Sequence, residues 1–145
     1  MTLFRRASLF LALFMIVGFA SFAQEQDKAQ SKLYMDQANE IMAATRAMDD
    51  ARDIMITAAD FDTTNVLANF EAGRMRAETI NKELAVKYFL RVYRQNPNYR
   101  FDLECWIAKS YHYGLSLDKA IDFYSRYKNK LAKKPDYHME RINST

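Results

Sequence analysis

Residues 66–99, VLANFEAGRMRAETINKELAVKYFLRVYRQNPNY, decide the fold of this chain. Apolar residues recur at helical spacing on both sides of Asn81, a residue type that suits a helix N-cap. In the second half, Ala85, Phe89 and Val92 fall at i, i+4 and i+7, which is one face of an amphipathic helix. The stretch therefore predicts two helices joined by a short turn.

The same arrangement recurs on both sides of this stretch, at spacings of 34 and 35 residues. The second helices share a small residue followed four positions later by a large one: Ala51 and Met55, Ala85 and Phe89, Ala120 and Tyr124. The first helices align Asn39, Gly73 and Ala108, followed three positions later by Met42, Arg76 and Tyr111. Small residues at Gly73 and Ala108 would let two helices approach closely. The sequence predicts three antiparallel helix pairs: Ala29–Thr45 with Asp49–Ala59, Asn65–Thr79 with Lys82–Arg94, and Asp102–Tyr113 with Leu117–Leu131.

The composition excludes several other classes of protein. Half of the 145 residues are hydrophobic, which favours a folded chain, and 3 Gly and 2 Pro are too few for a β-sandwich or barrel. One Cys and two His cannot build a disulfide framework or a Cys-based zinc site. Neither a Ser-His-Asp set nor a Gly-rich phosphate loop is found. We therefore expect a protein that is not an enzyme and uses neither cofactor nor metal.

The N-terminus has the three parts of a secretory signal peptide. Arg5 and Arg6 precede twelve non-polar residues, Leu9 to Ala20, and Ser21 and Ala23 supply small residues before Gln24. The apolar run is shorter than the roughly 20 residues of a membrane-spanning helix, so cleavage after Ala23 is favoured over an uncleaved anchor. Removing this segment lowers the net charge from +3 to +1 and leaves no basis for nucleic-acid binding. The chain is expected in the periplasm or at the periplasmic face of an outer membrane, touching a membrane only before cleavage.

From Lys32 to Leu131 the pattern resembles the tetratricopeptide repeat, a helix pair of about 34 residues. The signature positions of that family are occupied by Gly73, Ala85, Phe89, Pro97, Ala108, Tyr111, Ala120 and Tyr124. Asn39 and Thr63 depart from the pattern in the first repeat, and Trp106 lies two places from the family's early Trp. The resemblance implies an all-α, right-handed solenoid of three helix pairs that binds another protein.

This resemblance divides the chain into consecutive segments. A signal peptide (1–23) and a lead-in (24–31) precede repeats at 32–65, 66–99 and 101–134. The polar residues 132–145 form a tail or begin a further segment. More narrowly, the exported repeats are similar to the N-terminal region of OmpA-like envelope proteins associated with type IX secretion in gliding bacteria. That likeness implies a scaffold or adaptor in a cell-envelope or secretion assembly, or alternatively a docking or spacer domain of a larger peptidoglycan-associated protein.

In helical-repeat proteins a peptide groove is lined mainly by the first helix of each pair. In the register given above, the positions facing this groove are Asp36, Glu40 and Ala43, then Phe70, Arg74 and Ala77, then Cys105, Lys109, His112 and Tyr113. Arg74, Lys109 and His112 would hold a carboxylate of the partner, with Phe70 and Tyr113 offering apolar contact. We expect a peptide segment or a neighbouring protein as the partner. The alternative is an ordinary solvated helix face.

Overall fold

A computed structural model of the chain describes residues 2–45 and 47–133, with side chains from residue 23 onward. Within these ranges the regular secondary structure is helical and contains no strand. The prediction of an all-α protein is therefore confirmed. The chain divides into two compact units, Met1–Asn65 and Val66–Thr145, each with its own set of helices.

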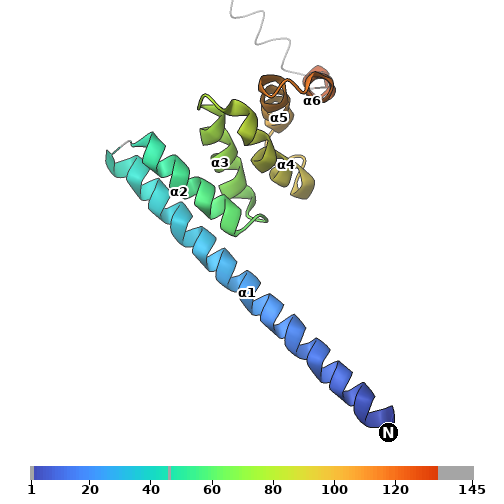
Figure 1. The fold of residues 1–145 in the computed structure, drawn as a ribbon. Coiled ribbons are helices and arrows are strands. Elements are labelled where there is room, and N and C mark those ends of the chain that lie inside the picture. Colours follow the sequence, from blue (N-terminus) through green and yellow to red (C-terminus); the bar gives the residue numbers. More distant parts are fainter. Residues whose placement is uncertain (1, 46, 134–145) are drawn as a thin grey trace, which may run out of the picture. The chain divides into compact units, whose positions relative to one another are not determined.

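The N-terminal unit consists of two antiparallel helices that run side by side (Figure 1), α1 (Thr2–Thr45) and α2 (Met48–Phe61). Buried residues recur at i, i+4 and i+7 on both helices, as an amphipathic helix requires. They are Ser31, Met35 and Ala38 on α1, and Ala51, Met55 and Ala58 on α2. The rings of Tyr34 and Phe61 stack with centroids 5.4 Å apart, which ties the last third of α1 to the end of α2.

Helix α1 starts much earlier than the sequence pattern predicts. It begins at Thr2 rather than Ala29 and continues through Ala23, Gln24 and the expected lead-in. No Pro or Gly lies between Ala20 and Thr45, and Ala, Gln, Glu and Lys dominate residues 23–30. Such residues favour a helix, so nothing in this stretch ends one. The backbone is thus helical across the predicted cleavage position.

Between residues 66 and 133 the C-terminal unit has five helical segments, and each contacts its neighbour along the chain. They are α3 (Val66–Ala77), the 3-10 helix η1 (Lys82–Ala85), α4 (Val86–Gln95), α5 (Leu103–Tyr113) and α6 (Leu117–Ala132). Helices α3 and α4 form one pair, α5 and α6 form the next, and both η1 and α4 contact α5. The predicted helix Lys82–Arg94 is divided into the 3-10 helix η1 and α4, which begins at Val86. The other helix ends differ from the predicted ones by two residues at most. The exposed Pro97 lies in the loop after α4, where it cannot interrupt a helix.

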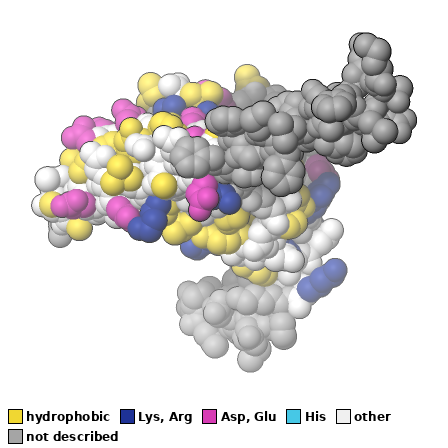
Figure 2. All heavy atoms as spheres, turned by 90° about the horizontal axis from the view of Figure 1, so that it is seen from below, with side chains coloured by type: hydrophobic (Ala, Val, Ile, Leu, Met, Phe, Trp, Pro, Cys, Tyr) yellow, Lys and Arg dark blue, Asp and Glu magenta, His cyan; other side chains and the backbone are white. Residues whose placement is uncertain are grey.

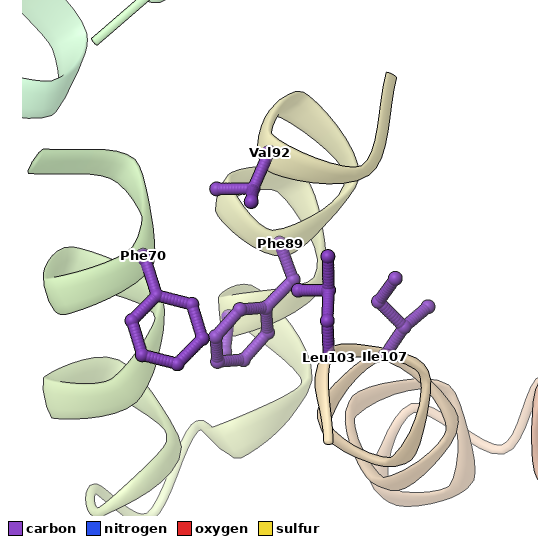
Figure 3. Packing of buried hydrophobic residues seen from close by; sticks show 6 residues of the cluster. Phe70, Phe89, Val92, Leu103 and Ile107 are labelled. Carbon is purple, nitrogen blue, oxygen red and sulfur yellow. The ribbon is translucent and has the colours of Figure 1, made fainter. Parts of the chain in front are cut away.

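A seam of apolar side chains joins α3, α4 and α5 (Figure 3). The ring of Phe70 on α3 points at Phe89 on α4, with centroids 5.8 Å apart, and Leu103 and Ile107 of α5 complete the seam beside Val92. Each of these five side chains is 2% exposed or less. Three helices therefore share one core, so the unit is held together by more than pairwise contacts.

Gly73 allows α3 and α4 to approach each other closely. A Cβ atom at this position would lie 2.7 Å from Cε1 of Phe89, closer than two carbon atoms can come without displacement. Ala85 and Ala108, at other signature positions, are fully buried, and Ala120 is 3% exposed. Tyr111 is half-buried and stacks on Phe123 at 6.0 Å. The small residues of the repeat pattern thus lie where helices meet.

The turn between α5 and α6 uses its glycine for space rather than for backbone freedom. Gly114 has an ordinary φ of −84°, and the positive φ of 56° falls on Leu115. A Cβ at Gly114 would lie 3.1 Å from Cβ of Glu83, so this position is small because η1 passes against it. Leu115 occupies the left-handed region, which is uncommon for a residue other than glycine, while 82% of its side chain is exposed.

The surface carries charges of both signs. On the face seen in Figure 2, acidic and basic side chains are interspersed among apolar ones, and neither sign forms a continuous field. In the described part of the chain, no helix is both long and apolar enough to cross a membrane.

Candidate functional site

One face of α5 carries the predicted groove residues of the third repeat. Cys105, Lys109, His112 and Tyr113 occur at i, i+4, i+7 and i+8 of a continuous helix, so they lie on one side of it. We call this set the α5 outer face. Cys105 is half-buried and the other three are exposed. The opposite side of α5, with Leu103 and Ile107, is used for the core.

Other elements contribute side chains to the edge of the α5 outer face. Lys82 of η1 places its ammonium 4.7 Å from the ring centroid of Tyr113, which is a cation–π distance. From α6, Tyr124 meets the ring of His112 edge-on at 6.3 Å. The ammonium of Lys109 lies 5.3 Å from the ring of Trp106. The surface therefore combines two lysines with aromatic rings supplied by two helices, α5 and α6.

Trp106 connects this surface to the apolar seam. Its ring stacks on Phe89 with centroids 5.7 Å apart, and its indole Nε1 donates a hydrogen bond of 3.0 Å to the Asp102 carboxylate. Asp102 also accepts a 3.2 Å bond from Nε of Arg100. The start of α5 is thus fixed by side chains from within one turn, and the α5 outer face is presented by a rigid helix.

The electrostatics of the α5 outer face are set mainly by partial burial. Burial raises the pKa of the Cys105 thiol, Asp102 adds to the rise, and the charge of Lys109 opposes it. Burial also raises the pKa of Tyr124, with smaller contributions from Cys105 and Tyr113. Both groups therefore stay protonated at neutral pH, and the lysines carry the charge of this surface.

We expect Cys105 to react slowly with thiol reagents. Because its pKa is raised, the reactive thiolate forms at higher pH than in free cysteine. Lys109→Gln removes the charge that lowers this pKa and should move the midpoint of the alkylation rate against pH upward. The rate with iodoacetamide between about pH 6 and 10, a range that spans the usual thiol pKa, measures both effects. Lys119→Gln on α6 is the matched control, and an unchanged midpoint in the Lys109 variant would contradict the assignment.

The expectation that Phe70 faces a groove is wrong. Its side chain is 2% exposed and lies in the seam between Phe89 and Tyr99, whose ring centroid is 5.5 Å away. The guanidinium of Arg100 covers the ring at 5.0 Å. In the second repeat this position therefore belongs to the core, because α5 and the loop before it pack across α3 and α4.

Arg74 is exposed in part, but two carboxylates already neutralise it. It forms ion pairs of 2.9 Å with Glu71 on the same helix and 3.1 Å with Glu78, the first residue after α3. A ligand carboxylate would have to displace one of them. In the N-terminal unit, Asp36, Glu40 and Ala43 are exposed on α1, and Asp36 pairs with Lys32 at 2.7 Å. The other two residues predicted to hold a carboxylate, Lys109 and His112, are exposed, and no ion pair is found for either among the described residues.

Two polar features were not found by sequence reasoning. Nζ of Lys130 on α6 lies 3.1 Å from Oε2 of Glu104 on α5, and the Glu104 side chain is only 9% exposed. A pocket of about 190 Å³ is lined by Arg76, Glu83, Leu84, Val86, Lys87 and Tyr88. Nε of Arg76 is buried and has no hydrogen-bond partner. Arg76 occupies the same position in its repeat as Met42 and Tyr111 in theirs. Of these three equivalent residues it alone is charged, and this difference is the sequence signal that could have identified it.

The part of the chain that the structure describes contains no candidate metal site. There, no three His, Cys, Asp or Glu side chains lie close enough together to hold a metal ion. Comparisons with protein-family models, with curated proteins and with solved structures find no match for this chain.

Proposed function

We propose that this chain is a non-catalytic, tetratricopeptide-like module that binds a segment of another protein. The observation that carries the proposal is the α5 outer face. Lys109, His112 and Tyr113 stay exposed on a helix whose opposite side is fully used for packing. Because these residues are held on a helix, binding a partner requires no ordering of their backbone.

The chemistry of the α5 outer face favours a segment that carries both a carboxylate and an apolar side chain. Lys82 and Lys109 supply positive charge, while the rings of Tyr113 and Tyr124 supply apolar surface. Interfaces are enriched in tyrosine because one side chain offers apolar area together with a hydrogen-bonding hydroxyl. The partner class is therefore an acidic, aromatic- or aliphatic-containing peptide segment.

Selection of phage-displayed peptides on the purified chain tests this proposal. We expect selected peptides to combine Asp or Glu with an apolar residue. Lys109→Glu should weaken their binding about tenfold or more, because a repulsion replaces one charge-assisted hydrogen bond. Arg74→Ala is the matched control and should change affinity little, because Glu71 and Glu78 already hold that cation. Peptides that bind the Lys109 variant as well as the parent chain would refute the proposal.

We further propose that the module acts outside the cytoplasm, as a scaffold or adaptor in a cell-envelope or secretion assembly. Support comes from the basic, apolar and small-residue order of residues 1–23, followed by exposed Ala23 and Gln24. Mass spectrometry of the N-terminus in producing cells is expected to find Gln24 as the first residue. Recovery of the chain with residues 1–23 attached would contradict cleavage.

A further inference from the structure

Helix α6 leaves most of its apolar residues unused by the core. Among its 16 residues only Ala120 is buried. Leu117, Ile121, Tyr124 and Leu131 lie at i, i+4, i+7 and i+14, on one lateral face that we call the α6 stripe. Leu117 is 52% exposed and Ile121 63% exposed, while Tyr124 and Leu131 are half-buried. By contrast, Phe123 of the same helix packs inward against Tyr93 and Tyr111.

The charges beside the α6 stripe differ between the two ends of the helix. Asp118 lies in the first turn, and Lys128 lies ten residues later, in line with the stripe. Both are exposed, and no ion pair is found for either among the described residues. Asp122 is already neutralised by Arg126 at 2.9 Å. The stripe is therefore acidic at its start and basic toward its end.

We propose that the α6 stripe binds the α6 stripe of a second copy of this chain, with the two helices antiparallel. A two-fold axis near residue 123 would bring Ile121 against Tyr124 of the other copy and Asp118 against Lys128. The same ion pair would form twice, since a two-fold interface repeats every contact. Opposed helix dipoles would also favour the antiparallel direction.

This charge pattern is the reason to choose a second copy over another partner. An acidic start and a basic end are complementary to the same helix reversed, and they need no other molecule to supply the opposite charges. The interface would be about 24 Å long, at 1.5 Å per residue for a helix of this size. The inference goes beyond peptide binding, because the proposed dimer contacts lie on α6 and leave Lys109 of the α5 outer face unengaged. Tyr124 is the residue that the two proposed surfaces share.

Sedimentation equilibrium of the purified chain over a hundredfold concentration range tests the proposal. We expect a monomer–dimer equilibrium. Ile121→Asp should weaken it about a hundredfold or more, because two carboxylates would be buried at the axis. Ile80→Asp is the matched control: this side chain is 94% exposed, lies outside the α6 stripe and should leave the dimer unchanged. A chain that stays monomeric throughout, or a dimer that Ile121→Asp does not weaken, overturns the proposal.

A charge exchange tests the antiparallel register separately. Asp118→Lys and Lys128→Asp should each weaken the dimer about tenfold, since each replaces two attractions by two repulsions. The double variant should recover most of the parent affinity. Loss without recovery would overturn the register. Lys109→Glu should weaken peptide binding and preserve the dimer, so failure of one proposal is distinguishable from failure of the other.

Discussion

Replacing Phe89 with alanine is expected to lower the free energy of unfolding by about 3–5 kcal/mol, the range for removing a buried aromatic side chain. Phe89 is fully buried and its ring contacts both Phe70 and Trp106. Its removal would therefore leave a cavity between α3, α4 and α5. The approach of Gly73 to the same ring limits how far α3 can move in to fill that space.

Urea denaturation followed by far-UV circular dichroism measures this loss. Trp106 fluorescence, read in parallel, reports on the same seam because it is the chain's one tryptophan. Tyr113→Ala is the matched control, since that ring is 56% exposed and its loss should cost about 0.5 kcal/mol or less. Equal destabilisation by the two variants would show that the seam is not the core of the unit.

Breaking the ion pair between Glu104 and Lys130 is expected to have the second-largest effect. Removing one partner of a buried pair costs about 3–5 kcal/mol, and the lower end applies because a quarter of the Lys130 side chain remains exposed. Lys130→Gln should cost more than Glu104→Gln, because it strands the more deeply buried charge. Thermal and urea denaturation of both variants measure the difference.

Replacing both Glu104 and Lys130 by leucine compares the Coulomb attraction of the ion pair with the cost of desolvating its two charges. Neither Oε2 of Glu104 nor Nζ of Lys130 has a well-directed hydrogen bond, so the pair gains little beyond its Coulomb attraction. The double variant should therefore be about as stable as the parent chain or more stable. A double variant clearly less stable than the parent chain would mean that the ion pair contributes net stability to the packing of α5 on α6.

The helix pattern of the C-terminal unit could be predicted because local rules agree there. Periodicity, turn residues and the 34- and 35-residue spacings all mark the same boundaries. The sequence pattern does not predict the start of α1, because the signal-peptide pattern of residues 1–23 runs directly into helix-forming residues. No Pro or Gly separates the two stretches. Sequence alone therefore shows where this helix ends but not where it starts.

The candidate site could be predicted only in part. Lys109, His112 and Tyr113 share an exposed helix face, which follows from spacing alone. The burial of Phe70 depends on how α5 and the loop before it pack against the pair α3–α4. The spacing of residues in the sequence does not specify this packing. Lys82 and Tyr124 reach the site from η1 and α6. The Glu104–Lys130 ion pair joins residues 26 positions apart. These contacts arise from tertiary packing, which local sequence patterns do not reveal.

The order of contacts in the C-terminal unit also has a kinetic consequence. Each helix meets elements that adjoin it along the chain, from α3 through α4 and α5 to α6. Closing such short loops costs little entropy, and folds dominated by local contacts reach the native state in microseconds to milliseconds. Leu103 and Ile107 of α5 complete the core that α3 and α4 share. The pair α3–α4 therefore gains its full stability only when α5 packs against it. A ribosome would therefore have to release α5 before the preceding pair could become stable.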